Sequence, residues 1–279
     1  VAGRSGRLSG VLTFNNHPAS VLRPDFLGRY LTSLDDRLCL LAELGPDLVL
    51  PVSFDLDLSR LAAREFVALL QDRLLMKDLV VGPDFAMGHN REGDVETLAA
   101  LGSEMGFTLH VVEPLLDEAG HAIRSTHVRD TLTEGDISTA SELLGRNFTL
   151  RGVVESGEGR GGPLGFPTAN LGVRDGMAVP ADGIYATWGL IAGDRHMAAT
   201  SIGVRPTFGK GQRTIEAFVL DYEGDLYGQQ IGLEFVSRLR PEIRFDSVQE
   251  LQEQVRQDVA ETRAVLEDGQ VAPGSEVRG

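Results

Sequence analysis

The sequence predicts two domains: an α/β domain of the doubly wound type over residues 1–148, and a small antiparallel β-barrel with a C-terminal helix over residues 149–268. The length of 279 residues is enough for two full cores. Short apolar runs alternate with segments of helical spacing up to residue 148, and strand-like runs separated by glycines follow. Residues 269–279 have no such periodicity, so we expect a disordered tail.

The first half alternates strands with helices. Apolar runs predict strands at residues 10–14, 47–52, 79–82 and 108–112. Apolar spacing predicts helices at residues 34–44, 62–74, 95–105 and 128–132. This alternation implies a parallel sheet with helices on both faces. Ligands of such a sheet bind beyond the carboxyl ends of its strands, so the segments that follow the strands are candidate binding residues.

Three of these segments carry polar or aromatic candidates. His17 follows the first strand, and Asp84 with Phe85 follows the third. A histidine before a proline is also typical of a turn, and Asp84 with Phe85 could simply close a loop.

Beyond the fourth strand, Ser125, Thr126 and Arg129 stand near the start of a predicted helix. Two hydroxyls, N-terminal amides and a guanidinium together suit a phosphate group, since arginine can bind phosphate through two parallel hydrogen bonds. Simple helix capping is the alternative for these residues.

The second half reads as a barrel closed by one helix. Strands are predicted at residues 150–154, 183–190, 196–202, 214–221 and 230–239. Ser247 and Glu250 form a capping-box pattern at the start of the last helix. Its expected apolar stripe consists of Val248, Leu251, Val255, Val259 and Leu266.

A glycine-rich stretch, residues 157–170, is the strongest candidate for a binding loop. Its glycines allow backbone N–H groups to converge on phosphate, and the candidates for nucleotide or flavin binding there are Gly157, Arg160, Gly161 and Phe166. Thr168 and Asn170 offer a hydroxyl and an amide oxygen, which suit Mg²⁺. Local pattern alone is equally compatible with a glycine-rich hairpin loop.

Glu216 is the candidate catalytic base. It lies in a predicted strand, where alternate residues share a face, so it should lie alongside Phe218 and Leu220. A carboxylate on an apolar face is either paired or desolvated, and desolvation makes it a stronger base. A strand-edge position in water is the alternative.

Composition narrows the class of partner and the compartment. The formal net charge is −15, which argues against binding nucleic acid or an anionic membrane, because both require a basic surface. Cys39 is the only cysteine, so no intrachain disulfide is possible. No apolar run approaches the length of a membrane helix, and no signal-peptide pattern opens the chain. These features predict a cytoplasmic protein; they do not predict its oligomeric state.

The glycine-rich loop with the Leu-Gly-Phe-Pro-Thr-Ala-Asn-Leu sequence of residues 164–171 resembles the riboflavin kinase domain of prokaryotic bifunctional riboflavin kinase/FAD synthetases. The resemblance implies that Thr168 and Asn170 bind Mg²⁺ and phosphate, and that Glu216 is the base for the substrate hydroxyl. The implied substrates are riboflavin and ATP.

The first half is similar, in order and spacing, to the FMN adenylyltransferase module of the same family. The similar segments are residues 12–18, 21–24, 82–88, 125–129 and 143–146. By this resemblance Ser125, Thr126 and Arg129 hold ATP phosphates, Asp84 and Phe85 lie near the flavin, and His17 lines the same cleft.

One family segment is not found in this sequence. The phosphate loop that follows the first strand in this family, with its glycine turn and histidines, has no counterpart here. We therefore expect a doubly wound domain that is incomplete at its amino end, with an impaired adenylyltransferase step.

The predicted function is ATP-dependent phosphorylation of riboflavin to FMN, with FMN adenylation to FAD by the parent protein. The alternative from another class is a flavin- or nucleotide-binding module without catalysis.

Overall fold

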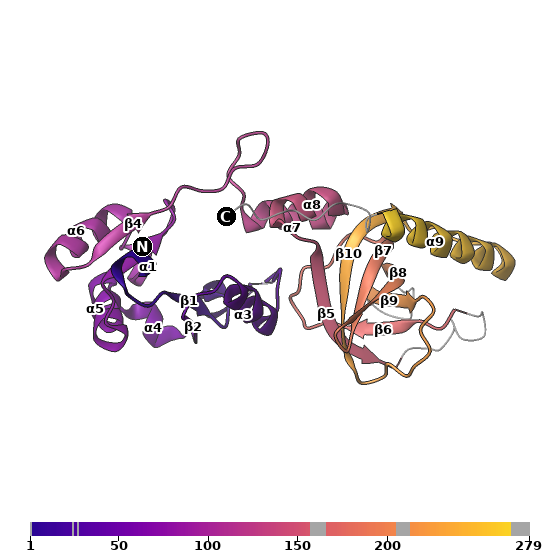
Figure 1. The fold of residues 1–279 in the computed structure, drawn as a ribbon, viewed down its shortest axis with the longest axis horizontal. Helices are drawn as coiled ribbons and strands as arrows, with labels where there is room; N and C mark the ends of the chain where they lie inside the picture. The colour runs from indigo at the N-terminus through magenta and orange to yellow at the C-terminus, as the bar shows by residue number, and fades with distance from the viewer. Residues whose placement is uncertain (1, 24, 27, 157–165, 205–212, 269–279) are drawn as a thin grey trace. The chain divides into compact units, whose positions relative to one another are not determined.

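The computed structural model describes residues 2–23, 25–26, 28–156, 166–204 and 213–268, and the predicted tail lies outside them. The chain forms two compact units, which are drawn in Figure 1. Unit 1 comprises Val1–Gly28 and Ser33–Ile123, and unit 2 comprises Arg29–Thr32 and Arg124–Gly279.

Unit 1 contains the predicted parallel strands. β1 (Gly10–Phe14) pairs with β2 (Leu48–Val52), and β3 (Asp78–Val81) pairs with β4 (Thr108–Val111), both in parallel. The α/β class is therefore confirmed. Within the described residues these strands form two separate two-stranded sheets, not the single sheet expected, because apolar runs identify strands but not their neighbours.

Helices connect these strands and supply the core of unit 1. They are α1 (Ala2–Ser5), α2 (Pro18–Leu22), α3 (Leu34–Glu43), α4 (Leu56–Arg60), α5 (Ala63–Leu74), the 3₁₀ turn η1 (His89–Arg91) and α6 (Val95–Met105). Ser33 caps α3 by accepting a hydrogen bond from the amide of Asp36, as its position predicts. The core joins α5 and α6 through Val67, Leu98 and Leu101.

Unit 2 contains the predicted closed antiparallel barrel (Figure 1), and its strand order is β10-β5-β6-β9-β8-β7. The strands are β5 (Phe148–Glu155), β6 (Ala169–Gly172), β7 (Gly183–Ile191), β8 (Asp194–Val204), β9 (Arg213–Val219) and β10 (Gln230–Arg240). The four-residue strand β6 was not predicted, because it is too short to show alternation. Fully buried side chains such as Phe148, Leu233 and Phe235 fill the interior.

Two helices before the barrel belong to its unit. α7 (Ser125–Glu134) and α8 (Ile137–Leu144) contribute Val128, Leu132 and Ile137 to the same apolar core as the barrel strands. The compact units therefore divide between residues 123 and 124, whereas the sequence pattern changes at 148 and 149. The predicted boundary marks the change from helices to strands, and not the edge of a compact unit.

The C-terminal helix α9 (Val248–Asp268) packs on the barrel. Of its predicted stripe, Leu266 is buried and Leu251, Val255 and Val259 are half-buried. Val248 is 55% exposed, whereas Asp258 and Thr262 are buried with Leu266. The carboxylate of Asp258 binds the guanidinium of Arg240 with two hydrogen bonds of 2.8 and 2.6 Å. The apolar pattern therefore did not predict the burial of Asp258, because a buried ion pair stands there in place of an apolar contact.

Tyr185 gives a pH-dependence that can be tested. Its ring is buried, and its hydroxyl donates a 2.5 Å hydrogen bond to the carbonyl of Ala181. Burial raises the pKa of Tyr185 to about 12, so the folded state keeps a proton that the unfolded chain loses near pH 10. This contribution to stability is complete below about pH 10 and is lost as the pH rises towards about 12.

Tyr185→Phe is therefore expected to lose about 1 kcal/mol at neutral pH and to show a shallower fall in stability at alkaline pH than the wild type. Urea unfolding at a series of pH values measures both effects. Tyr227→Phe, which changes a side chain 57% exposed, is the control. Parallel alkaline curves for wild type and Tyr185→Phe would contradict the assignment.

Candidate functional site: a carboxylate beside a hydroxyl and an amide

Three of the predicted site residues meet where β6 lies beside β9. Asn170 and Glu216 are directly paired across these antiparallel strands. Thr168 immediately precedes β6, and its hydroxyl donates a 3.3 Å hydrogen bond to Oε2 of Glu216. The structure thus brings the candidate base and both candidate metal ligands together.

The barrel fixes the direction of these side chains. Along β9, Ile215, Ala217 and Val219 are buried in the barrel core, so the alternate residues Glu216 and Phe218 lie on the outer face. Glu216 is half-buried on that face, as Phe218 is. The predicted alternation with Phe218 is correct, whereas Leu220, predicted on the same face, lies beyond the end of β9 and is buried.

Two further contacts bound the site on the same face. Ser201 of β8 pairs directly with Glu216, so its side chain lies on the outer face as well. Phe166 packs edge-on against Phe218, with ring centroids 5.4 Å apart. Glu216 therefore has polar neighbours on both adjoining strands and an aromatic pair two residues further along β9.

The available ligand atoms suit a hard cation. Thr168, Asn170 and Glu216 offer hydroxyl, amide and carboxylate oxygens, which are ligand types of Mg²⁺. Among the described residues there is no group of three or more His, Cys, Asp or Glu side chains that could hold a metal. A cation at this site would therefore depend on oxygens from water or substrate phosphate in addition to the protein.

Gly157, Arg160 and Gly161 lie outside the described residues, so their predicted contacts with nucleotide stay predictions.

The predicted phosphate residues lie on α7, in the same unit as the barrel. Ser125 and Thr126 occupy its first two positions and are exposed. Arg129 is half-buried one turn later, and its Nε donates a 2.6 Å hydrogen bond to the carbonyl of Arg29. The two hydroxyl residues at the helix start are exposed, and part of the Arg129 guanidinium binds the protein backbone. The phosphate-binding role of these residues stays a prediction.

His17, Asp84 and Phe85 lie in unit 1. His17 caps α2, because its Nδ1 accepts a 3.1 Å hydrogen bond from the amide of Ala19. Its ring also stacks on Phe26 at a centroid distance of 4.5 Å. Asp84 and Phe85 are exposed in the turn after β3. The turn interpretation of His17 thus describes its local contacts, and the flavin-binding role of all three stays a prediction.

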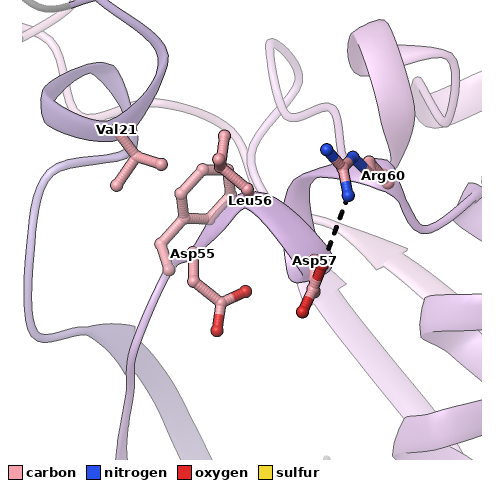
Figure 2. A pocket seen from close by; sticks show the side chains of 6 residues that line it. Val21, Asp55, Leu56, Asp57 and Arg60 are labelled. Atoms are coloured by element: carbon pink, nitrogen blue, oxygen red, sulfur yellow. Dashed lines mark hydrogen bonds and ion pairs between the residues drawn. The ribbon is translucent and has the colours of Figure 1, made fainter.

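Sequence analysis missed an open pocket of about 480 Å³ beyond the carboxyl ends of β1 and β2. Figure 2 shows side chains around it, and the lining residues are Val21, Phe54, Asp55, Leu56, Asp57 and Arg60. Its charged rim includes a 3.4 Å ion pair between Arg60 and Asp57. The position of Phe54–Asp57 directly after the second strand could have predicted this pocket, because ligands of parallel sheets bind at that end.

Comparisons with known families also divide the chain into two parts. Residues 144–266 match the riboflavin kinase family, and residues 1–127 match the FAD synthetase family. These matches define a riboflavin kinase domain joined to an FAD synthetase domain.

Similar proteins carry both domains in one chain. A bifunctional riboflavin kinase/FMN adenylyltransferase of Listeria monocytogenes is 34% identical over 268 residues, which are 95% of this chain and 84% of that protein. One of Escherichia coli K12 is 37% identical over 250 residues, 89% of this chain and 79% of that protein. The chain belongs to the bifunctional riboflavin kinase/FMN adenylyltransferase family.

A solved structure covers both units. A crystal structure from Streptococcus pneumoniae, described as a macrolide-efflux protein, has a TM-score of 0.85 and 30% identity, and it covers 94% of this chain and 85% of that chain. None of these comparisons supports the expectation that the chain lacks an amino-terminal segment of the family.

Proposed function

We propose that the barrel unit transfers the γ-phosphoryl group of ATP to the terminal hydroxyl of riboflavin and so makes FMN. The observation that carries this proposal is the contact of Glu216 with Thr168, together with the direct pairing of Glu216 with Asn170. A kinase of an alcohol needs a base at the hydroxyl and groups that neutralise the transferring phosphoryl oxygens.

Each residue has a separate task. Glu216 accepts the proton of the substrate hydroxyl as the new O–P bond forms and the bond to ADP breaks. The Thr168 hydroxyl, by donating to Glu216, holds that carboxylate in position. Thr168 and Asn170 are the residues that would hold Mg²⁺, which when bound supplies positive charge next to the phosphate oxygens.

The FAD synthetase domain supports a second step, the adenylation of FMN to FAD. We assign Ser125, Thr126 and Arg129 to the ATP phosphates, because the first turn of α7 presents hydroxyls and backbone amides where anions are stabilised. Asp84, Phe85 and His17 are assigned to the flavin side of that reaction.

Chromatographic separation of flavins tests both steps. The full chain is incubated with riboflavin, ATP and Mg²⁺, and formation of FMN followed by FAD is expected. Folded protein that binds riboflavin but makes no FMN would overturn the kinase proposal and leave a non-catalytic flavin-binding module. FMN without FAD would restrict the proposal to the kinase step.

Thr168→Val and Asn170→Ala are expected to raise the Mg²⁺ concentration needed for half-maximal kinase activity, because each removes one oxygen ligand. The measurement is a Mg²⁺ titration at saturating ATP. Ser20→Ala, an exposed hydroxyl in unit 1, is the control and should titrate as the wild type does. An unchanged Mg²⁺ requirement in both site variants would show that these residues do not hold the cation.

The proposed partners are the small molecules riboflavin, FMN and ATP, and the proposed compartment is the cytoplasm. The net charge of −15 supports a partner that carries its own cation over nucleic acid or an anionic membrane. Within the described part of the chain, the helices are too short or too polar for a transmembrane span.

A further inference from the structure

Glu242 brings a second carboxylate to the outer face of the barrel. It lies two residues after the end of β10, and its carboxylate rests against the backbone of Gly203 in β8. A Cβ at position 203 would overlap that carboxylate, so the absence of a side chain at Gly203 leaves the space that Glu242 occupies.

The strand register places this carboxylate close to the kinase site. Gly203 pairs with Thr214, and Ser201 pairs with Glu216, in the same β8–β9 ladder. Positions 201 and 203 share a face, so Glu242 covers the outer-face position next to the one that pairs with Glu216. Two residues along a strand correspond to about 7 Å.

The segment that carries Glu242 is attached to α9 through the neighbouring residue Arg240. Arg240 binds Asp258 through two hydrogen bonds, and its Nη1 donates a 3.0 Å hydrogen bond to the carbonyl of Pro241. The ion pair is largely buried, since the side chains are 18% and 5% exposed. Glu242 therefore leaves a fixed backbone and does not extend from a free loop.

The surroundings do not fully compensate the charge of Glu242. Partial burial raises the pKa of Glu242, and the nearby carboxylates of Asp182 and Glu216 raise it further, while Arg240 and Arg213 oppose the rise. Among the residues that the structure describes, none donates a hydrogen bond to its carboxylate. A donor supplied by a ligand would stabilise the charged form.

We propose that Glu242 accepts a hydrogen bond from an inner hydroxyl of the substrate's polyol chain, and so positions the terminal hydroxyl of that chain at Glu216. Riboflavin carries a five-carbon polyol chain on its ring system, which bears both inner hydroxyls for Glu242 and a terminal hydroxyl for Glu216. This inference rests on the proposed kinase function and adds a specificity determinant to it.

Equilibrium binding tests the inference without turnover. Riboflavin and lumiflavin share the flavin ring, but lumiflavin has a methyl group in place of the polyol. Glu242→Ala is expected to raise the Kd of riboflavin by about tenfold or more, while the Kd of lumiflavin changes by less than twofold. Both titrations follow the quenching of flavin fluorescence.

Two further variants separate positioning from general damage. Gly203→Ala should displace the Glu242 carboxylate and give the same selective loss of riboflavin affinity. Glu223→Ala removes an exposed carboxylate elsewhere in the barrel unit and should change neither affinity. Thermal unfolding establishes whether each variant is folded. Because Glu242 is exposed, Glu242→Ala alone tests the inference if Gly203→Ala does not fold.

The outcomes are distinguishable. An unchanged riboflavin Kd in Glu242→Ala, or an equal loss for both flavins, would overturn the inference. A KM for ATP that rises as much as the KM for riboflavin would do the same, because the proposed contact is to the flavin substrate. If riboflavin binds in a manner that depends on Glu242 but no FMN forms, the kinase proposal fails and the assigned contact stands.

Discussion

Replacing Glu216 by glutamine is expected to lower the kcat of riboflavin phosphorylation by about 10²-fold or more, the usual size of the loss of a general base. Glutamine keeps the shape of the side chain, and its amide oxygen can still accept the hydrogen bond from Thr168. It cannot take a proton from the substrate at neutral pH. Riboflavin affinity should therefore change little while turnover falls.

The measurement is steady-state kinetics with FMN quantified by chromatography, alongside a riboflavin titration of the same protein. Glu223→Gln makes the same chemical change at an exposed position in the barrel unit and should leave kcat within twofold. Equal kcat values for wild type and Glu216→Gln would show that another group, or phosphoryl transfer without a base, carries the reaction.

Removing the carboxylate of Asp258 is expected to have the largest effect on stability. Asp258→Ala leaves the Arg240 guanidinium without its bidentate partner at a site where the two side chains are only 5% and 18% exposed. An uncompensated buried charge of this kind costs about 3–5 kcal/mol. We expect a large fall in the urea concentration at the midpoint of unfolding of the barrel unit.

Two controls sharpen this result. Glu253→Ala also breaks an ion pair of α9, but its pair with Arg256 is 79% and 60% exposed and should contribute little. Replacing both Arg240 and Asp258 by leucine should recover part of the loss, because neither charge then remains buried. If Asp258→Ala unfolds at the same urea concentration as the wild type, the pair does not hold the helix on the barrel.

The order of strands and helices could be read from the sequence, because apolar runs and spacing are local signals. The strand at residues 10–14 and the helix at residues 95–105 have the predicted bounds. The meeting of Glu216 with Thr168 and Asn170 was expected from a resemblance, and alternation along β9 gave the face that Glu216 shares with Phe218.

What the sequence did not predict depends on contacts between distant segments. Whether α7 packs with unit 1 or with the barrel is decided by which core buries Val128 and Leu132, and helical spacing is the same in both cases. The carboxylate of Glu242 on Gly203 is another such contact, because no local pattern relates a residue after β10 to a glycine in β8.

The barrel unit is not one continuous piece of the polypeptide, since Arg29–Thr32 belongs to it although the flanking residues belong to unit 1. The amide of Tyr30 donates a 2.7 Å hydrogen bond to the carbonyl of Gly176, and the carbonyl of Tyr30 accepts one of 2.8 Å from Ala178. A gene fragment that starts at codon 124 would encode every strand of the barrel but omit residues 29–32 and the two hydrogen bonds of Tyr30. Division of the chain at this single point would therefore leave residues 29–32 on a different protein from the segment they bind.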